Sequence, residues 1–318
     1  MWTKTIGLPK QMFILGLIKQ NQLQEMFGLL RIQHHHVTQR KLGKQNLMPN
    51  PVVVNTIQSP YIKGSRLWRV LVDKSKTFWI SGNDSTIYQI DQRGSKLKTI
   101  SPAGEVLVLS LNMKNELIFS LWGQNTTIYR HNDIKIRTEL ELFKWTPRGI
   151  CHSVNGDHLL VSMRSVDLSK SRVVRYFGKI ETMVIQNDKH GKPLFSVGTI
   201  AVLLLTENGN ADVCVADYES GSVVVVDAIG ELRFKYCKNV STKSKHKSFS
   251  PINIATDVNH NILINDSSYD IVHVIDSDGH FLRYIEFPCN GEMSIDRDHN
   301  LVVGEETSGK IRIIKYLQ

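Results

Sequence analysis

One pattern recurs along the chain from about residue 66 onward. Each copy has an apolar stretch, a turn with Asp, Asn or Gly, a strand ending in a small or acidic residue, a polar loop and a second alternating strand. The clearest copies begin at Phe78, Val213, Ile262 and Leu301, and looser copies begin at Leu117 and Leu159. One equivalent position, which we call the anchor, is held by Ile80, Phe119, Val161, Val215, Ile264 and Val303, with spacings of 39, 42, 54, 49 and 39 residues.

These repeats predict an all-β fold, a six-bladed β-propeller. Their apolar residues alternate with a period of two, which excludes helical repeats. One blade cannot bury both faces of its sheet, whereas blades arranged radially cover one another. The last copy ends without a fourth strand, and "PVVVNTI" at Pro51–Ile57 is a strand without a partner. We therefore expect residues 51–318 to form the propeller, with this segment completing the last blade and closing the ring.

The first 50 residues differ from the repeats. Their apolar positions have loosely helical spacing, interrupted by Gly16 and Gly28, and a polar stretch follows from residue 33. This pattern predicts an N-terminal appendage made of a short amphipathic helix and a linker. The net charge of +9 divides into +6 for residues 1–60 and +3 for residues 61–318. Most of the basic character therefore belongs to the first segment and not to the propeller.

Composition and cysteine spacing narrow the class of protein. The chain is 41% hydrophobic and 22% charged, as globular proteins are. Its best apolar stretch, Met12–Ile18, is too short to cross a membrane, and no small-residue cleavage site follows it. Cys151, Cys214, Cys237 and Cys289 lie far apart, which suits neither a disulfide framework nor a zinc module. We expect a cytoplasmic protein with reduced thiols and no membrane partner.

Several segments carry a resemblance to a known family. They are "RVVRY" at Arg172, "HGKPLFS" at His190, "ENGNADVCVADYESGSVVVVDAIGELRFKY" at Glu207, "HVIDSDGHFLRYI" at His273 and "IRIIKYL" at Ile311. With them, about 265 residues of the chain resemble the NHL-repeat propellers at the C-terminal end of tripartite-motif (TRIM) proteins, particularly the TRIM-like proteins of bivalve molluscs. "FGLL" at Phe27 and "PVVVNTI" at Pro51 are similar to the family's segment between coiled coil and propeller.

The resemblance implies a role in recognition without catalysis. Full-length TRIM relatives are ubiquitin ligases because their RING finger recruits the conjugating enzyme, and a RING holds two zinc ions with closely paired Cys and His residues. This sequence contains no such pairs, and most of the coiled coil is also missing. We expect this chain to be the substrate-binding part of a protein in ubiquitin-linked or innate immune signalling. Ligase activity and oligomerisation are expected only where a longer form or a partner supplies them.

Two sets of equivalent positions test the sequence for a metal or catalytic site. Nine residues before the anchors, where a ring of ligands would line the channel, stand Leu71, Ser110, His152, Thr206, Ala255 and Ser294. Seven residues before them stand Asp73, Asn112, Val154, Asn208, Asp257 and Asp296. A lone His makes no ligand ring, and turn or polar residues after each Asp or Asn indicate turns, not a calcium cage. We expect no metal, cofactor or catalytic residue; a metal-dependent propeller hydrolase is a minor alternative.

Residues on loops that should share one rim are the candidates for binding a protein or peptide: Trp122, Trp145, Arg148, Arg164, Tyr218 and Tyr269. Large exposed aromatic side chains often anchor a partner. The alternative ligand is single-stranded RNA, which needs cations together with stacking aromatics. Its candidates are Lys144, Arg148, Arg164, Lys238, Lys243, Lys245 and Lys247. The loops after the second strands carry eight acidic residues against three basic ones, so this rim is patchy in charge.

Overall fold

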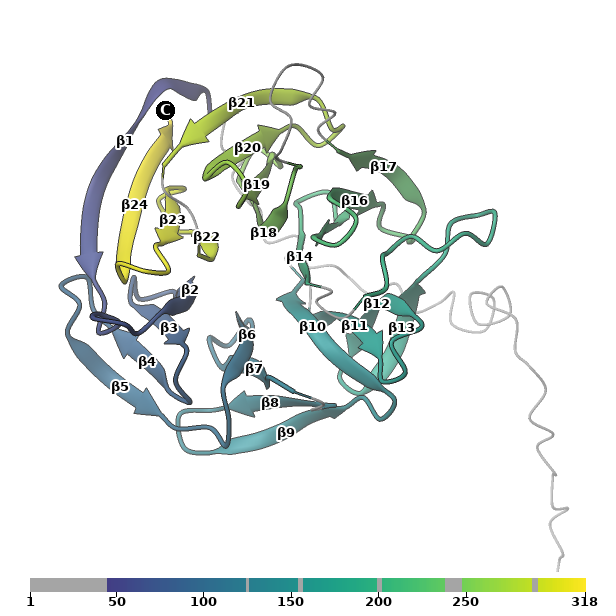
Figure 1. The fold of residues 1–318 in the computed structure, drawn as a ribbon, viewed down its shortest axis with the longest axis horizontal. Helices are drawn as coiled ribbons and strands as arrows, with labels where there is room; N and C mark the ends of the chain where they lie inside the picture. The colour runs from purple at the N-terminus through teal and green to yellow at the C-terminus, as the bar shows by residue number, and fades with distance from the viewer. Residues whose placement is uncertain (1–44, 124–125, 154–156, 199–201, 238–247, 288–290) are drawn as a thin grey trace, which may run out of the picture. The chain divides into compact units, whose positions relative to one another are not determined.

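A computed structural model describes residues 45–123, 126–153, 157–198, 202–237, 248–287 and 291–318. Within these residues the chain forms 24 β-strands and no helix. The strands make six four-stranded antiparallel sheets, the blades, which are arranged radially around a central channel (Figure 1). The prediction of an all-β, six-bladed propeller is confirmed. The predicted N-terminal helix falls in residues 1–44, outside the described residues.

Each blade begins with its innermost strand, and the blades follow one another in chain order (Figure 1). Blade 1 holds β2 (Leu67–Val72), β3 (Phe78–Gly82), β4 (Ile87–Ile90) and β5 (Lys96–Ile100), and blade 2 holds β6 (Val106–Leu111), β7 (Leu117–Leu121), β8 (Thr127–His131) and β9 (Ile136–Glu141). Blade 3 holds β10 (Trp145–His152), β11 (His158–Ser165), β12 (Ser171–Phe177) and β13 (Ile180–Ile185), and blade 4 holds β14 (Leu203–Glu207), β15 (Val213–Asp217), β16 (Ser222–Val226) and β17 (Leu232–Tyr236). Blade 5 holds β18 (Pro251–Thr256), β19 (Ile262–Asp266), β20 (Ile271–Ile275) and β21 (Phe281–Glu286), and blade 6 holds β22 (Met293–Ile295), β23 (Leu301–Gly304), β24 (Lys310–Leu317) and β1 (Leu47–Gln58).

The hydrophobic core lies between neighbouring blades. Trp79 of blade 1, for example, shares a buried cluster with Phe119 of blade 2. Another cluster joins Ile57 of blade 6 to Leu67 of blade 1 and so continues the core around the ring. Strands covered on both faces are mostly apolar, as in β16, where all five residues are buried and four of them are valine. The blades therefore form one structural unit, because each completes the core of the next.

The ring is closed by pairing between the two ends of the propeller. β1 runs antiparallel to β24, with Val53 opposite Ile314 and Ile57 opposite Ile311. Beyond the strands, Asn46 and Gln318 exchange backbone hydrogen bonds of 2.9 Å in both directions. The predicted closure is confirmed, and the closing strand begins at Leu47, a few residues before the expected Pro51.

The antiparallel order of each blade gives the disc two different rims. Hairpins between the first and second strands, and between the third and fourth, lie on one rim, which we call the Asx-turn rim. Hairpins between the second and third strands, together with the links from blade to blade, lie on the other, which we call the connection rim.

The Asx-turn rim repeats one turn. Five blades carry the predicted Asp or Asn after the innermost strand: Asp73, Asn112, Asn208, Asp257 and Asp296. Each accepts backbone N–H groups two and four residues later, as in Asp257, whose Oδ1 lies 2.9 Å from Asn259 N and 2.8 Å from Asn261 N. The interpretation of these residues as turn formers is confirmed. Val154, the sixth member, lies outside the described residues.

Candidate functional sites: the central channel and the connection rim

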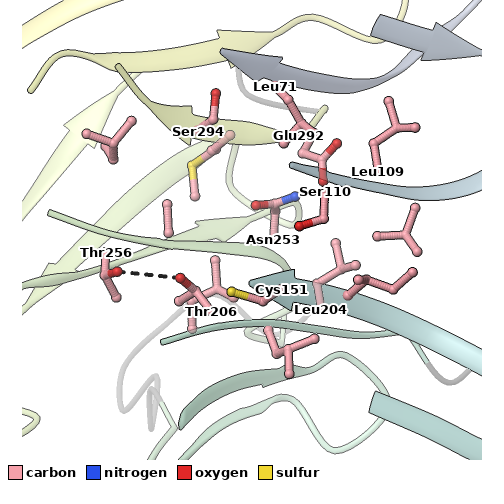
Figure 2. Close-up of a pocket in the computed structure, with 17 residues that line it drawn as sticks. Leu71, Leu109, Ser110, Cys151, Leu204, Thr206, Asn253, Thr256, Glu292 and Ser294 are labelled. Carbon is pink, nitrogen blue, oxygen red and sulfur yellow. Dashed lines mark hydrogen bonds between the residues drawn. The ribbon is translucent and has the colours of Figure 1, made fainter. Parts of the chain in front are cut away.

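The central channel is lined by the innermost strands of all six blades (Figure 2). It contains a cavity of about 240 Å³. One ring of equivalent residues in its lining consists of Leu71, Ser110, Cys151, Thr206, Ala255 and Ser294. Five of these six are the residues that the repeat spacing places in this ring. The spacing therefore identifies the channel lining correctly in every blade except blade 3.

In blade 3 the expected ring residue, His152, is replaced by Cys151. The first hairpin of this blade is one residue longer than in the others, so that Ile150 pairs with Val161 and the counted position shifts by one. His152 Nε2 lies 3.4 Å from Asp157 Oδ1 in that hairpin. The expectation that His152 belongs to the channel ring is therefore wrong.

A polar corner of the channel went unnoticed in the sequence. Glu292 is only 6% exposed, and its Oε2 accepts a hydrogen bond of 3.1 Å from Val70 N. Burial raises the pKa of this carboxyl to about 7, while the charge of Arg69 and hydrogen bonding from Val70 N and Asn253 oppose the rise. Figure 2 shows Glu292 and Asn253 in the channel lining. Arg69, Asn253 and Glu292 all stand eleven residues before an anchor, in three neighbouring blades. Alignment of the repeats at that position was the signal that could have found them.

Among the described residues, the polar groups of the channel lining are one carboxyl, one amide, one thiol and several hydroxyls. Burial raises the pKa of the Cys151 thiol to about 11, so this thiol stays protonated at neutral pH. In the part of the chain that the structure describes, no three His, Cys, Asp or Glu side chains lie together as a metal ion requires. Glu292 supplies the channel with a carboxyl group that titrates near neutral pH, beside an amide and several hydroxyls.

Three of the predicted partner-binding residues lie on loops of the connection rim. Trp122 follows β7 and is 46% exposed, and its ring packs edge-on against Trp68 with 6.3 Å between centroids. Tyr218 and Tyr269 follow β15 and β19 in the equivalent hairpins of other blades and are half-buried. The topology thus brings these side chains to one rim, and their role in binding stays a prediction.

The other three predicted residues lie in strands of blade 3, not on loops. Trp145 begins β10, where it is half-buried and the Arg172 guanidinium stacks 4.1 Å from the centre of its ring. Arg148 lies within β10, and Arg164 lies in β11, where it is only 5% exposed and donates a hydrogen bond to the Gly198 carbonyl. The expected loop positions are wrong because the first two strands of blade 3 extend further toward this rim than their equivalents.

Around Trp145 the structure places exposed apolar residues that sequence analysis did not select. Phe143 is 82% exposed, and Val166 and Leu168 are 43% and 40% exposed. A backbone hydrogen bond of 2.9 Å from Val166 N to Lys144 O joins their two loops, and a cavity of about 420 Å³ lies between them. We call this surface the blade-3 rim site, defined by Phe143, Lys144, Trp145, Val166, Leu168 and Lys170. Its sequence signal is the pair of aliphatic residues Val166 and Leu168, because the equivalent hairpins of the other blades carry no aliphatic residue.

The charge of the connection rim is mixed. Lys144 is exposed there, whereas Lys238, Lys243, Lys245 and Lys247 lie outside the described residues. Several of the acidic residues counted against RNA hold structural hydrogen bonds. Asp84 accepts from Tyr61 Oη at 2.8 Å, Asp217 from Ser196 N at 2.7 Å, and Glu306 from Arg66 at 2.8 Å. These carboxylates belong to the framework of the rim and keep its negative charge in place.

Two further findings concern the cysteines and the membrane-spanning character of the described residues. In the described residues, Cys151, Cys214 and Cys237 are free thiols, and Cys289 lies outside those residues. A search of the same residues finds no helix with the length and apolar character needed to traverse a bilayer.

Comparisons with known proteins place the fold among β-propellers. No protein-family model matches the chain, and no curated protein matches it. Among solved structures, a gluconolactonase from Xanthomonas campestris is similar with a TM-score of 0.59 and 12% identity over 87% of this chain and 98% of that one. A virginiamycin B lyase from Staphylococcus aureus has a TM-score of 0.53 and 12% identity, over 86% of this chain and 99% of that one. The WD40 propeller of Doa1 has a TM-score of 0.53 and 11% identity, over 84% of this chain and 98% of that one. At these identities the likeness shows the β-propeller fold alone.

Proposed function

We propose that this chain is a non-catalytic recognition propeller of the NHL type, whose connection rim binds a segment of a partner protein. The observation that carries the proposal is the blade-3 rim site. Exposed apolar side chains next to a cavity and flanked by cations are typical of protein-binding surfaces. The cavity of about 420 Å³ has room for one or two side chains of a partner.

The backbone at Phe143 supports this assignment. Its φ of +51° lies in the left-handed region, which is unfavourable for a bulky side chain. The same residue is 82% exposed and therefore gains little from burial in the free protein. A conformation that costs free energy and holds an aromatic ring in water is a sign of function.

The resemblance to TRIM proteins supports a setting for this recognition. In that family the NHL propeller follows the ligase part of the chain, so the rim would select proteins for ubiquitin-linked or innate immune signalling. A RING on a longer form of the chain or on a partner would supply the ligase activity. The similar lactonase and lyase structures are enzymes, but in the described residues of this chain no three His, Cys, Asp or Glu side chains lie together as ligands of a catalytic metal would.

The test is selection of ligands by the full chain. A display library of random 12-residue peptides is panned on immobilised protein, and selected peptides are measured by fluorescence polarisation. Phe143→Ala and Trp122→Ala should weaken binding about tenfold or more. The matched controls lie on the Asx-turn rim: Ile229→Ala, at a residue 74% exposed, and Phe281→Ala, at a residue 45% exposed, should leave the affinity unchanged.

A pool of single-stranded RNA, measured at low and physiological salt, provides the opposing arm. RNA binding that survives physiological salt and weakens in Lys144→Ser would make this an RNA reader and overturn the proposal. Failure to select any peptide would also contradict it.

A further inference from the structure

Two arginines of blade 3 lie close together at the connection rim. Arg148 is the extra residue of a β-bulge in β10, between the pairs Pro147–Met163 and Gly149–Ser162. Arg164 lies on the neighbouring strand β11, opposite Thr146. A bulge re-aims a side chain, and blades 1, 2 and 5 have one at the equivalent place with Trp68, Leu107 and Ile252 as the extra residue. What is particular to blade 3 is that its bulge carries an arginine. The strand register places Arg148 next to the pair Pro147–Met163 and Arg164 directly after Met163, so the two arginines are neighbours on adjacent strands. Burial, and after it the charge of Arg164, lowers the pKa of Arg148 to about 10.

Within the described residues, the two arginines lack a direct ion pair. No ion pair joins Arg148 or Arg164 to a described carboxylate, and Arg148 makes no hydrogen bond to any described residue. The Nε atom of each is buried without an acceptor. The internal segments outside the described residues contain no Asp or Glu at all. Among the described residues, Arg148 therefore has no direct anionic partner, and Arg164 has the exposed Glu219 carboxylate near it without an ion pair.

Other arginines of the same blade show what a compensated guanidinium looks like. Arg172 lies 3.1 Å from Glu181 Oε1, and the partly buried Arg175 lies 2.9 Å from Glu207 Oε1. Burying a charge is unfavourable unless it is paired, and two like charges side by side add repulsion. An anion placed between Arg148 and Arg164 would remove both penalties.

We propose that Arg148 and Arg164 form a preorganised receptor for a single carboxylate, the Asp or Glu side chain of the partner segment that the blade-3 rim site binds. This inference rests on the proposed function and adds the chemistry of the ligand. Guanidinium groups donate paired hydrogen bonds that match a carboxylate in shape and charge.

The surroundings favour one carboxylate over a polyphosphate chain. Exposed Asp167 lines the cavity of the blade-3 rim site, and exposed Glu219 is near enough to Arg164 to counteract the fall in its pKa that burial causes. A nucleic acid strand would bring further phosphates against these carboxylates. A peptide can present one acidic side chain to Arg148 and Arg164 while its apolar residues contact Phe143 and Val166.

The test uses a peptide selected from the random 12-residue library and its analogues with each acidic residue changed to the amide. The full chain is compared with Arg148→Met and with Arg137→Met, which removes an exposed arginine from the outer strand β9. We expect that one Asp→Asn or Glu→Gln change in the peptide weakens its binding to the wild-type protein about tenfold or more. The same change should have little effect on binding of the peptide to Arg148→Met. Arg137→Met should behave as the wild type does.

Thermal unfolding without peptide gives a second measurement. Arg148→Met should raise the midpoint, because it removes an uncompensated charge, whereas an arginine with a structural role would lower it when replaced. If Arg148→Met does not fold, Arg164→Lys takes its place, because it keeps the charge and loses the paired hydrogen-bond geometry. This variant should weaken binding of the acidic peptide more than binding of its amide analogue. Selected peptides that bind equally well as amides would overturn this inference and leave the proposed function standing. Failure to select any peptide would overturn both.

Discussion

The two rims of the propeller treat their polar groups in opposite ways. On the Asx-turn rim, Asp257 uses Oδ1 for two backbone N–H groups and Oδ2 for Asn261 Nδ2 at 2.9 Å and Tyr316 Oη at 3.2 Å. On the connection rim, Arg148 has no described partner and Phe143 stands in water. The repeated turns of the first rim satisfy their own hydrogen-bonding groups, whereas the second rim leaves the Arg148 guanidinium without a described hydrogen-bond partner.

This difference teaches how a repeated unit acquires a function. The Asx-turn rim carries the same turn in five blades, so a change there disturbs folding. At the third residue after the anchor, on the connection rim, three neighbouring blades instead carry Trp122, Arg164 and Tyr218. Residues that differ between equivalent positions can specify a ligand without altering the common framework.

Among changes that test the difference between the rims, the largest loss of stability is expected at Asp257 on the Asx-turn rim. Asp257→Ala removes all four of its hydrogen bonds and leaves buried donors, including that of Tyr316, which is fully buried, without acceptors. We expect a loss of about 3 kcal/mol in the free energy of unfolding, because each orphaned buried donor is costly. Denaturant unfolding followed by circular dichroism measures this loss.

Blade 4 supplies the matched control for that variant. Asn208 occupies the equivalent turn and accepts the same two backbone N–H groups, each at 2.9 Å. Asp257→Asn should therefore cost about 1 kcal/mol, the value of the Oδ2 contacts alone. Equal losses in the two variants would show that the turn bonds do not stabilise this rim.

A somewhat smaller effect, dependent on pH, is expected from the channel between the rims. Burial raises the pKa of Glu292 from its ordinary value of 4.5 to about 7, so the folded protein favours the protonated form. Its contribution is complete below about pH 4.5 and is lost as the pH rises through about 7. The loss should amount to roughly 2 kcal/mol, since the open channel lets water reduce the penalty.

Glu292→Gln should remove this slope when unfolding free energies are measured from pH 4.5 to 8. Glu286→Gln, on the exposed outer strand β21, is the control and should run parallel to the wild type. A slope that persists in Glu292→Gln would assign the pH dependence to other groups and would remove Glu292 as a distinct polar feature of the channel.

The sequence predicts the fold and the Asx-turn rim well because both depend on local, repeated signals. Alternation with a period of two and anchors 39 to 54 residues apart identify the blades. The unpaired strand near Pro51 predicts the closure that β1 and β24 make. An Asp or Asn at a fixed distance from the anchor predicts a turn whose bonds form within five residues.

The candidate sites were harder to predict because they depend on features that no local pattern shows. The extra hairpin residue that moves Cys151 into the channel shifts the register of one blade only. The bulge at Arg148 recurs in blades 1, 2 and 5, so a strand pattern does not single out the arginine that it carries in blade 3. Phe143 resembles any core phenylalanine in sequence, yet the loop holds it in solvent. The burial of Arg164, whose Nε has no acceptor among the described residues, follows from three-dimensional packing, which counting along a strand cannot supply.

The smallest predicted effect concerns the backbone of the Asx turns. The third residue after the Asp or Asn has a φ between +60° and +65° in all five turns of this rim's inner hairpins. Outer hairpins place Gly94, Gly230 or Gly279 at the same point of the turn. Glycine adopts this conformation without strain, whereas other residues do so at a cost.

Ala211 holds this position in blade 4 with a φ of +63° and has no side-chain bond to lose. Ala211→Gly should raise the free energy of unfolding by about 0.5 kcal/mol, measured by denaturant unfolding. The control is Ala228→Gly, in the turn that Asp227 begins, where the backbone φ is not positive and the same change should destabilise the protein. Opposite signs in the two variants would show that the Asx-turn rim is governed by local backbone geometry. Equal signs would mean that packing between blades sets its stability, and the contrast with the connection rim would then be one of exposure alone.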